Sequence, residues 1–321
     1  MTAGGPPVLV VTRLDDATAD EVIVELNRRR VPVVRLDPGD FPREVSLSGT
    51  FDGSGPGGTL ATASRSLDLG NVRSVYWRRP TPSTADLALD GQTGRWAVEE
   101  ARYGLGGILA ALPGAHYLNH PWRNRDAEYK PAQLAAAAHC GFTVPATLIT
   151  NDPARARAFA AEHGPVVYKP LRETEYTDGA GRALTVWIED VTPDQIGNRL
   201  RHTAHLFQRR VDKSADVRLT AVGDYLTAVR IDGSPGVDWR RHYDRLTYTT
   251  VPVPPAVAKG VRAYLDAFGL SFGAFDFGLD RDGRWHWYEC NPNGQWAWFP
   301  DRITTPLTHA IADRLQHGAP A

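Results

Sequence analysis

The chain has 321 residues, a formal net charge of −1, 42% hydrophobic residues and 23% charged residues. A protein of this size usually folds into two or three domains, and a near-neutral charge gives no field that would draw it onto nucleic acid or an anionic membrane. The two cysteines, Cys140 and Cys290, form neither a disulfide framework nor a CxxC motif. No apolar stretch approaches the ~20 residues of a membrane span, and no signal-peptide pattern opens the chain. We therefore expect a cytoplasmic protein that binds neither nucleic acid nor membrane.

The first third of the sequence alternates short apolar runs with amphipathic segments, which predicts a small parallel sheet with helical crossovers. The expected strands and helices lie at residues 8–12, 16–29, 31–36, 75–77 and 94–112. Residues 46–66 are rich in Gly, Ser and Thr, and Gly53–Gly58 marks a loop there.

The remaining two thirds contain further strands and helices, expected at residues 125–140, 166–169, 183–188, 217–222, 226–231 and 256–268. The glycine-bearing segment Tyr176–Gly181 is either a plain hairpin turn or a loop that closes over phosphates with its backbone N–H groups. We divide the chain into an N-terminal domain (1–115), a central domain (116–205) and a C-terminal domain (206–321).

An acidic hairpin near the C-terminus carries the strongest chemical signal. Its two apolar arms flank Asp282-Gly283, a pair that favours a two-residue turn. Counting outward from that turn places Asp276 opposite Glu289, and facing carboxylates repel each other unless something neutralises them. Asn291, two residues beyond Glu289, points to the same face. Two carboxylates and an amide oxygen are ligands that suit Mg²⁺. The alternative is a solvated acidic pair without metal, but the aromatic neighbours favour the metal site. The small residues Ala274 and Gly278 on this face are expected to leave room for a nucleotide.

The segment Asp276…Glu289-Cys290-Asn291-Pro292-Asn293-Gly294-Gln295-Trp296 resembles the metal-binding segment of ATP-grasp enzymes, in the version of the graspetide synthetases, the microviridin-type peptide macrocyclases. Tyr76–Pro80, Asn119–Pro121 and Pro145–Asp152 are similar to further stretches of that family. The resemblance covers nearly the whole chain, with the motifs in the right order. It implies an α/β (α+β) ATP-grasp fold of three domains, with a small parallel-sheet N-terminal domain and ATP clamped between the central and C-terminal domains.

The resemblance also assigns residues to the nucleotide. Lys130 and Lys169, two of only four lysines in the chain, match the family's ATP-binding lysines. Asp216-Val217-Arg218 and Thr227–Arg230 are similar to the strand pair whose basic residues approach the transferred phosphate. We expect Arg218 and Arg230 to lie at matching positions on adjacent strands and to point at one anion. A salt-bridged sheet face is the alternative for this pair, and an exposed surface charge is the alternative for each lysine. No GxxxxGK[ST] motif occurs, which argues against a P-loop enzyme.

Other residues are assigned to adenine and peptide. Gln208 and the backbone near Arg210-Val211 are candidates for binding adenine, with an ordinary linker as the alternative. The resemblance implies that Arg240 and Arg241 hold an acidic peptide side chain, and the arginine fork suits a carboxylate. An exposed basic loop is equally compatible with them.

The resemblance implies that the leader of a precursor peptide docks on the central domain, where the acids Glu189 and Asp190 are candidates for binding it. They precede Thr192, the expected N-cap of a helix, so stabilisation of the helix dipole is the alternative.

The implied function uses ATP and Mg²⁺ as cofactors and a ribosomally made precursor peptide, leader and core, as partner. Side-chain carboxylates of that peptide would be phosphorylated and joined to hydroxyl or amine side chains as ω-esters or ω-amides, with release of ADP and phosphate. A ligase that adds amino acids to a peptide and a catalytically silent, nucleotide-dependent peptide-binding protein are the alternatives. A homodimer is the assembly considered.

Overall fold

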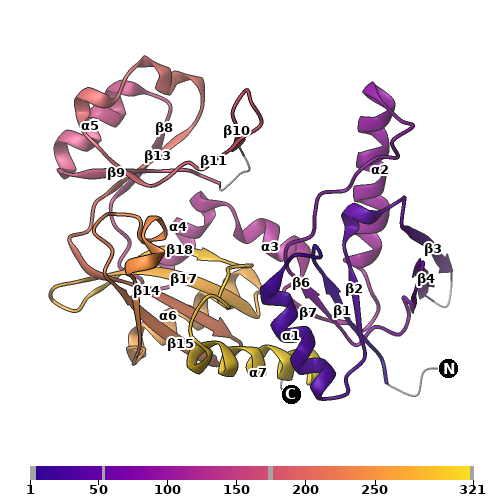
Figure 1. Cartoon of the computed structure of the whole chain (residues 1–321). Coiled ribbons are helices and arrows are strands. Elements are labelled where there is room, and N and C mark those ends of the chain that lie inside the picture. The colour runs from indigo at the N-terminus through magenta and orange to yellow at the C-terminus, as the bar shows by residue number, and fades with distance from the viewer. Residues whose placement is uncertain (1–4, 53–54, 173–175, 319–321) are drawn as a thin grey trace. The chain divides into compact units, whose positions relative to one another are not determined.

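The computed structural model describes residues 5–52, 55–172 and 176–318, and it divides into two compact units. Unit 1 comprises residues 1–125, 269–273 and 292–321, and unit 2 comprises residues 126–268 and 274–291. Figure 1 shows the helices and strands of both. This partition differs from the three domains expected from the sequence, and that division stays a prediction.

Unit 1 is built on a four-stranded parallel sheet, as the alternating pattern predicted. Its strand order is β2 (Val33–Leu36), β1 (Val8–Val11), β6 (Ser74–Trp77), β7 (His116–Leu118). All four residues of β1 are fully buried, because both faces of the sheet are covered. Helices α1 (Ala17–Arg28) and α7 (Asp301–His317) pack against each other and against this sheet. The carboxylate of Asp16 caps α1 by accepting from the Ala19 N–H.

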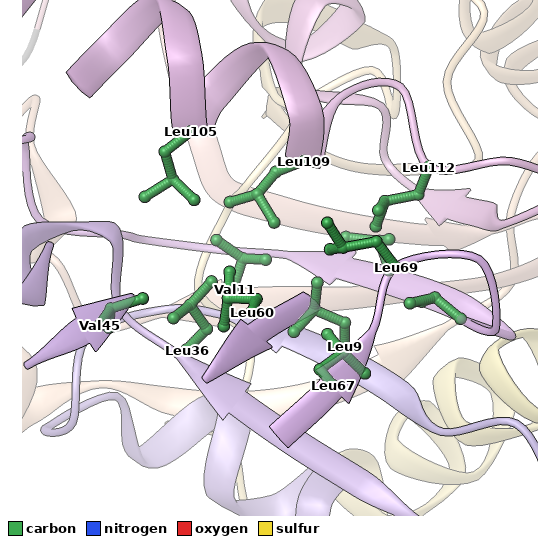
Figure 2. Packing of buried hydrophobic residues seen from close by; sticks show 12 residues of the cluster. Leu9, Val11, Leu36, Val45, Leu60, Leu67, Leu69, Leu105, Leu109 and Leu112 are labelled. Atoms are coloured by element: carbon green, nitrogen blue, oxygen red, sulfur yellow. The ribbon is translucent and has the colours of Figure 1, made fainter. Parts of the chain in front are cut away.

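Helix α2 (Gly91–Leu109) and a second sheet contribute to the core cluster of unit 1. The sheet consists of β3 (Val45–Asp52), β4 (Gly55–Thr62) and β5 (Ser66–Asp68). Figure 2 shows leucines from α2, β4 and β5 converging on Leu9 and Val11 of β1. The loop predicted at Gly53–Gly58 is therefore wrong over Gly55–Gly58, which begin β4. Val45, Leu60 and Leu67 supply enough buried apolar surface to form strands despite the glycines and serines between them. Gly53 and Ser54 lie outside the described residues.

Asn119, which follows β7, holds together two distant segments of unit 1. Its side-chain oxygen accepts hydrogen bonds from the Ser271 and Phe272 N–H groups, at 2.7 and 2.9 Å. Its nitrogen donates to the carbonyls of Phe272 and Pro292, at 2.9 and 3.0 Å. Every hydrogen-bonding direction of this buried amide is used, so the segment before the acidic hairpin is fixed beside the segment that follows it.

Unit 2 contains two sheets. The first has the order β12 (Glu189–Val191), β9 (Val166–Lys169), β13 (His205–Arg209), β8 (Thr147–Thr150) and packs against α5 (Pro153–His163). Its core consists of Ala156, Ala160, Val166, Ile196, Leu200 and Phe207. The strand predicted over residues 183–188 is shorter: β11 covers Ala183–Leu184 and pairs with β10 (Tyr176–Thr177).

The second sheet of unit 2 is antiparallel. Its order is β16 (Thr247–Val251), β15 (Tyr225–Asp232), β14 (Lys213–Val222), β17 (Phe272–Asp280), β18 (Trp285–Asn291). Tyr264 of α6 (Pro255–Phe268) contacts Phe275 and Trp287 at ring-centroid distances of 5.3 and 6.0 Å, so one face of the hairpin is an aromatic core. The single helix predicted over residues 125–140 is two, α3 (Pro121–Ala127) and α4 (Lys130–His139). No helix in the described part of the chain is long and apolar enough to cross a membrane.

Candidate active site

The acidic hairpin has the predicted pairing at its two acids but a different turn at its tip. Asp276 is paired with Glu289, as expected. The connecting loop, however, has three residues rather than two, and Gly283 closes it with a φ of 80°. Between the loop and the acids β18 contains one extra residue, because Phe277 pairs with Trp287 while Asp276 pairs with Glu289. The extra residue is Tyr288, which forms a β-bulge that restores the predicted pairing.

The bulge brings Tyr288 to the same face of the sheet as Glu289. A Cβ atom added to Gly278 would lie 2.1 Å from the Tyr288 hydroxyl oxygen, so the tyrosine ring occupies the space above this glycine. The expectation that Gly278 leaves room for a nucleotide is therefore wrong. The glycine instead makes room for Tyr288, whose ring centroid is 5.0 Å from the Lys169 ammonium.

Each of the two facing acids has its own basic partner. Arg218 on β14 donates to Asp276 at 2.8 Å, and Lys130, the first residue of α4, forms an ion pair with Glu289. Burial raises the pKa of Asp276, although Arg218 opposes this effect. Burial acts in the same direction on Glu289, but Lys130 and Lys169 outweigh it and hold the pKa of Glu289 well below its usual range. The repulsion expected between these carboxylates is therefore neutralised by residues predicted to bind ATP.

The donor set at this hairpin fits a divalent cation. The Asn291 amide nitrogen lies 3.4 Å from the Asp276 carboxylate and 3.3 Å from that of Glu289, so the three side chains converge. A half-turn of the amide would direct its oxygen to the same point. Among the described residues no group of three or more His, Cys, Asp and Glu side chains is placed to hold a metal. Two carboxylates and an amide leave further coordination positions for water and phosphates, as Mg²⁺ requires.

The two predicted ATP-binding lysines line one pocket with the hairpin. The pocket is formed by Lys130, Gln133, Leu134, Lys169, Leu206, Gln208, Trp287 and Tyr288. Lys169, at the end of β9, is 5% exposed and has Gln208 at 3.4 Å. Burial lowers the pKa of Lys169 to about 8, with Glu289 opposing and Lys130 adding repulsion. A buried ammonium group beside a second positive charge is unfavourable by itself, so a bound anion would stabilise both lysines.

Residues predicted to contact adenine lie along one stretch of chain. Gln208 is buried on β13, and its amide nitrogen donates to Thr147 at 2.9 Å. The Arg210 N–H donates to the Pro165 carbonyl at 2.8 Å, which removes it from the candidate donors. The Arg210 carbonyl and the backbone of Val211 stay candidates for binding adenine. Asp216 is buried and bound by Lys213 at 2.7 Å, so it anchors the start of β14 beside Arg218.

Arg230 is not on the same face as Arg218. The register of β14 and β15 pairs Arg218 with Val229 and Val217 with Arg230, so the two arginines point to opposite sides of the sheet. Arg230 instead binds Asp232 of its own strand at 2.8 Å. The expectation that both arginines point at one anion is wrong, and Arg218 alone faces the acids.

The candidate peptide-binding residues all take part in ion pairs. Arg240 binds Asp238 at 2.8 Å and Arg241 binds Glu189 at 3.0 Å. Asp190 is paired with Arg210 at 3.1 Å. The two acids lie on β12, and Thr192 and Gln195 form a capping box around the short 3₁₀-helix that follows (Pro193–Gln195). This cap satisfies the helix start without the acids, which weakens the helix-dipole explanation for them.

The segment Tyr176–Gly181 forms a plain hairpin turn. The Asp178 carboxylate accepts from the Ala180 and Arg182 N–H groups, both at 2.9 Å, and the Asp178 carbonyl accepts from Gly181. These N–H groups are therefore already used within the turn. The alternative in which they bind phosphates is not supported by this arrangement.

Comparisons with known proteins identify a family and several solved structures that this chain resembles. Residues 7–125 match the family described as the MvdD pre-ATP grasp domain. The RiPP-associated ATP-grasp ligase of Chryseobacterium gregarium, solved with ADP and a leader and core peptide, is 26% identical with a TM-score of 0.89 and covers 98% of both chains. The macrocyclase MdnC of Microcystis aeruginosa, solved with its precursor peptide MdnA, is 26% identical with a TM-score of 0.86, over 97% of this chain and 100% of that one.

A glutathione synthetase of Ralstonia nicotianae is 34% identical over 119 residues, which are 37% of this chain. The matched part spans 30% of that enzyme's length. The two structural likenesses, in contrast, extend over whole chains and include both sheets that form the pocket. The chain therefore has the fold of ATP-grasp ligases, and its whole-length likeness to RiPP-associated members supports a graspetide synthetase.

Proposed function

We propose that this protein is an ATP-dependent ligase that cross-links side chains of a ribosomally made precursor peptide. A side-chain carboxylate of the peptide is phosphorylated at the expense of ATP, and a hydroxyl or amine of the same peptide displaces the phosphate. The new bond is an ω-ester or an ω-amide, and the products are ADP and phosphate. The observation that carries this proposal is the pocket of unit 2 that Lys130 and Lys169 line together, with Lys130 also forming an ion pair with the hairpin acid Glu289.

In this proposal the basic residues bind phosphate and the acidic residues bind the metal. Lys130 and Lys169 bind phosphate oxygens, and Arg218 stabilises the negative charge that develops on the transferred group. Asp276, Glu289 and Asn291 would hold Mg²⁺, which when bound neutralises phosphate charge. With the carboxylates holding a metal, Lys130 and Arg218 would be available to bind phosphate oxygens.

The solved relatives make the peptide partner the expected one. The Chryseobacterium ligase was solved with a leader and core peptide, and MdnC with a precursor peptide. For this chain we propose Arg240 and Arg241 as ligands of the peptide carboxylate. Their present partners, Asp238 and Glu189, show that both guanidinium groups bind carboxylates at this place.

The test is mass spectrometry of a peptide encoded beside this gene, incubated with the protein, ATP and Mg²⁺. We expect the peptide to lose one water molecule per cross-link. A gain of amino-acid mass would indicate the ligase that extends peptides. Binding of the peptide without any mass change, even with MgATP present, would indicate a silent peptide-binding protein.

A further inference from the structure

The outer edge of β18 is held by side-chain and loop partners instead of another strand. β18 is the last strand of its sheet, so some of its backbone groups need partners from elsewhere. The Trp287 N–H donates to the Thr143 carbonyl at 2.9 Å. At Cys290 the partner is Gln133, whose side-chain oxygen accepts from the N–H at 3.2 Å and whose nitrogen donates to the carbonyl at 2.9 Å.

Gln133 thereby acts at the residue between two predicted metal ligands. The two peptide groups that flank Cys290 connect it to Glu289 and to Asn291, and one carboxamide binds both of these groups. Gln133 is 4% exposed, and its nitrogen also donates to the Ala127 carbonyl at 2.6 Å. The Gln133 carboxamide is therefore also bound to the chain segment that precedes its own helix, which restricts its movement.

The same helix binds the strand a second time. Lys130 lies one turn before Gln133 on α4, so both side chains extend from one face of the helix. Lys130 forms the ion pair with Glu289. Helix α4 therefore holds β18 at two successive residues, by charge at the Glu289 side chain and by hydrogen bonds at the Cys290 backbone.

We propose that Gln133 is a positioning residue that orients Glu289 and Asn291 for metal binding. The inference rests on the proposed function, because that function is what makes these side chains metal ligands. Groups that orient metal ligands typically change metal affinity by about 10- to 100-fold when they are lost. If Gln133 contributed only packing, its replacement would lower the stability of the protein without a specific effect on metal affinity.

The test is the Gln133→Met variant, which keeps the length of the side chain and removes its hydrogen bonds. Binding of Mn²⁺ to the protein–ADP complex, followed by electron paramagnetic resonance, should weaken by about tenfold. Hydrogen exchange of the metal-free protein should quicken at the Cys290 N–H. The Mg²⁺ concentration for half-maximal turnover should rise, while the peptide KM changes little.

The matched control is Gln195→Met, which removes an amide that caps Thr192 on another part of unit 2. Its metal binding should equal that of the wild type. A folded Gln133→Met protein with wild-type Mn²⁺ affinity would overturn the inference. Should this variant fail to fold, Gln133→Glu keeps the acceptor for the Cys290 N–H, and unchanged metal affinity there would overturn it equally. A wild-type protein that binds no metal with ADP would contradict the proposed function itself.

Discussion

Asp276 illustrates how the surroundings of a residue change a prediction about its stability. From the sequence alone, removal of one of two facing acids should relieve repulsion. In the structure Asp276 instead neutralises Arg218, whose side chain is only 8% exposed. The Asp276→Asn variant should therefore lose roughly 1–3 kcal/mol of unfolding free energy without metal and nucleotide, because the buried guanidinium keeps its charge and loses its partner.

Denaturant unfolding in a chelating buffer measures this effect, and turnover by the same variant should be abolished. Asp232→Asn is the matched control, since its partner Arg230 lies on the other face of the sheet and both side chains are about a third exposed. That exposed pair should contribute less than about 1 kcal/mol. An Asp276→Asn protein as stable as the wild type would show that the Arg218 pair has no net effect.

Lys169 should make nucleotide binding depend on pH. Because burial lowers its pKa to about 8, the free protein loses this positive charge above that pH. A bound phosphate favours the protonated lysine, so binding must take up a proton there. ADP affinity should fall by up to about tenfold per pH unit above pH 8 and stay flat below it.

Calorimetric titration with ADP in buffers of different ionisation enthalpy measures both the affinity and the proton uptake. Lys169→Arg should remove the dependence near pH 8, since a guanidinium stays charged. The control Lys259→Arg changes an exposed lysine of α6 and should leave the profile unaltered. An equally pH-dependent Lys169→Arg protein would assign the effect to another group.

Within the hairpin, the space left by Gly278 is what allows the Tyr288 ring to take its position. Gly278→Ala places a methyl group within contact of the tyrosine ring, which must move from its place beside Lys169. We expect a stability loss of about 1–3 kcal/mol, as for other overpacked sites, together with weaker ADP binding. The double variant Gly278→Ala/Tyr288→Leu should recover part of the stability loss, because the obstructing ring is gone.

A double-mutant cycle on thermal unfolding checks this coupling. Strictly additive losses would show that the ring and the glycine do not depend on each other. Tyr288→Leu alone is the necessary reference, since it removes the contact with Lys169 without adding volume at Gly278.

The elements show what the sequence could and could not predict. The pairing of Asp276 with Glu289 is predicted correctly although the turn is not, because the bulge at Tyr288 offsets the longer loop. Nothing in the local sequence identifies that bulge, whose position depends on packing on both faces. The opposite faces of Arg218 and Arg230, in contrast, can be predicted from the sequence. With Gly223-Asp224 as a two-residue turn, Arg218 pairs with Val229, so the opposite faces of the two arginines follow from the sequence. Gln133 could be located only as a neighbour of Lys130 on one helix face, since its partner Cys290 is far away in sequence.

For the whole molecule, the spent nucleotide distinguishes the proposed reaction from adenylation. The lysines and the acids surround the site expected for the terminal phosphates, so the products should be ADP and phosphate. Chromatography of the reaction mixture measures this directly. AMP and pyrophosphate would instead indicate an adenylating enzyme.

Recognition of the leader should depend on exposed charge at the edge of the first sheet of unit 2. The ion pairs of Glu189 and Asp190 are largely exposed, so each is weak and a basic leader residue can displace its arginine. The double variant Glu189→Gln/Asp190→Asn should weaken leader binding by roughly 1–3 kcal/mol and leave ATP affinity nearly unchanged.

Titration of a labelled leader peptide measures this loss. Glu162→Gln, an exposed acid on α5 of the same unit, is the control for general charge effects. Equal leader affinity of the double variant and the wild type would remove both acids from the peptide site.

The bulge in β18 also limits where residues can be added to or removed from the hairpin. Because side chains alternate along a strand, one residue added or removed between the bulge and Glu289 would turn that carboxylate toward the aromatic core. A length change at the tip, where Gly283 closes the loop, alters the size of the loop and leaves the pairing of Asp276 and Glu289 intact. Among functional members of the family, insertions and deletions in this hairpin should therefore occur at the tip and be absent between the bulge and Glu289.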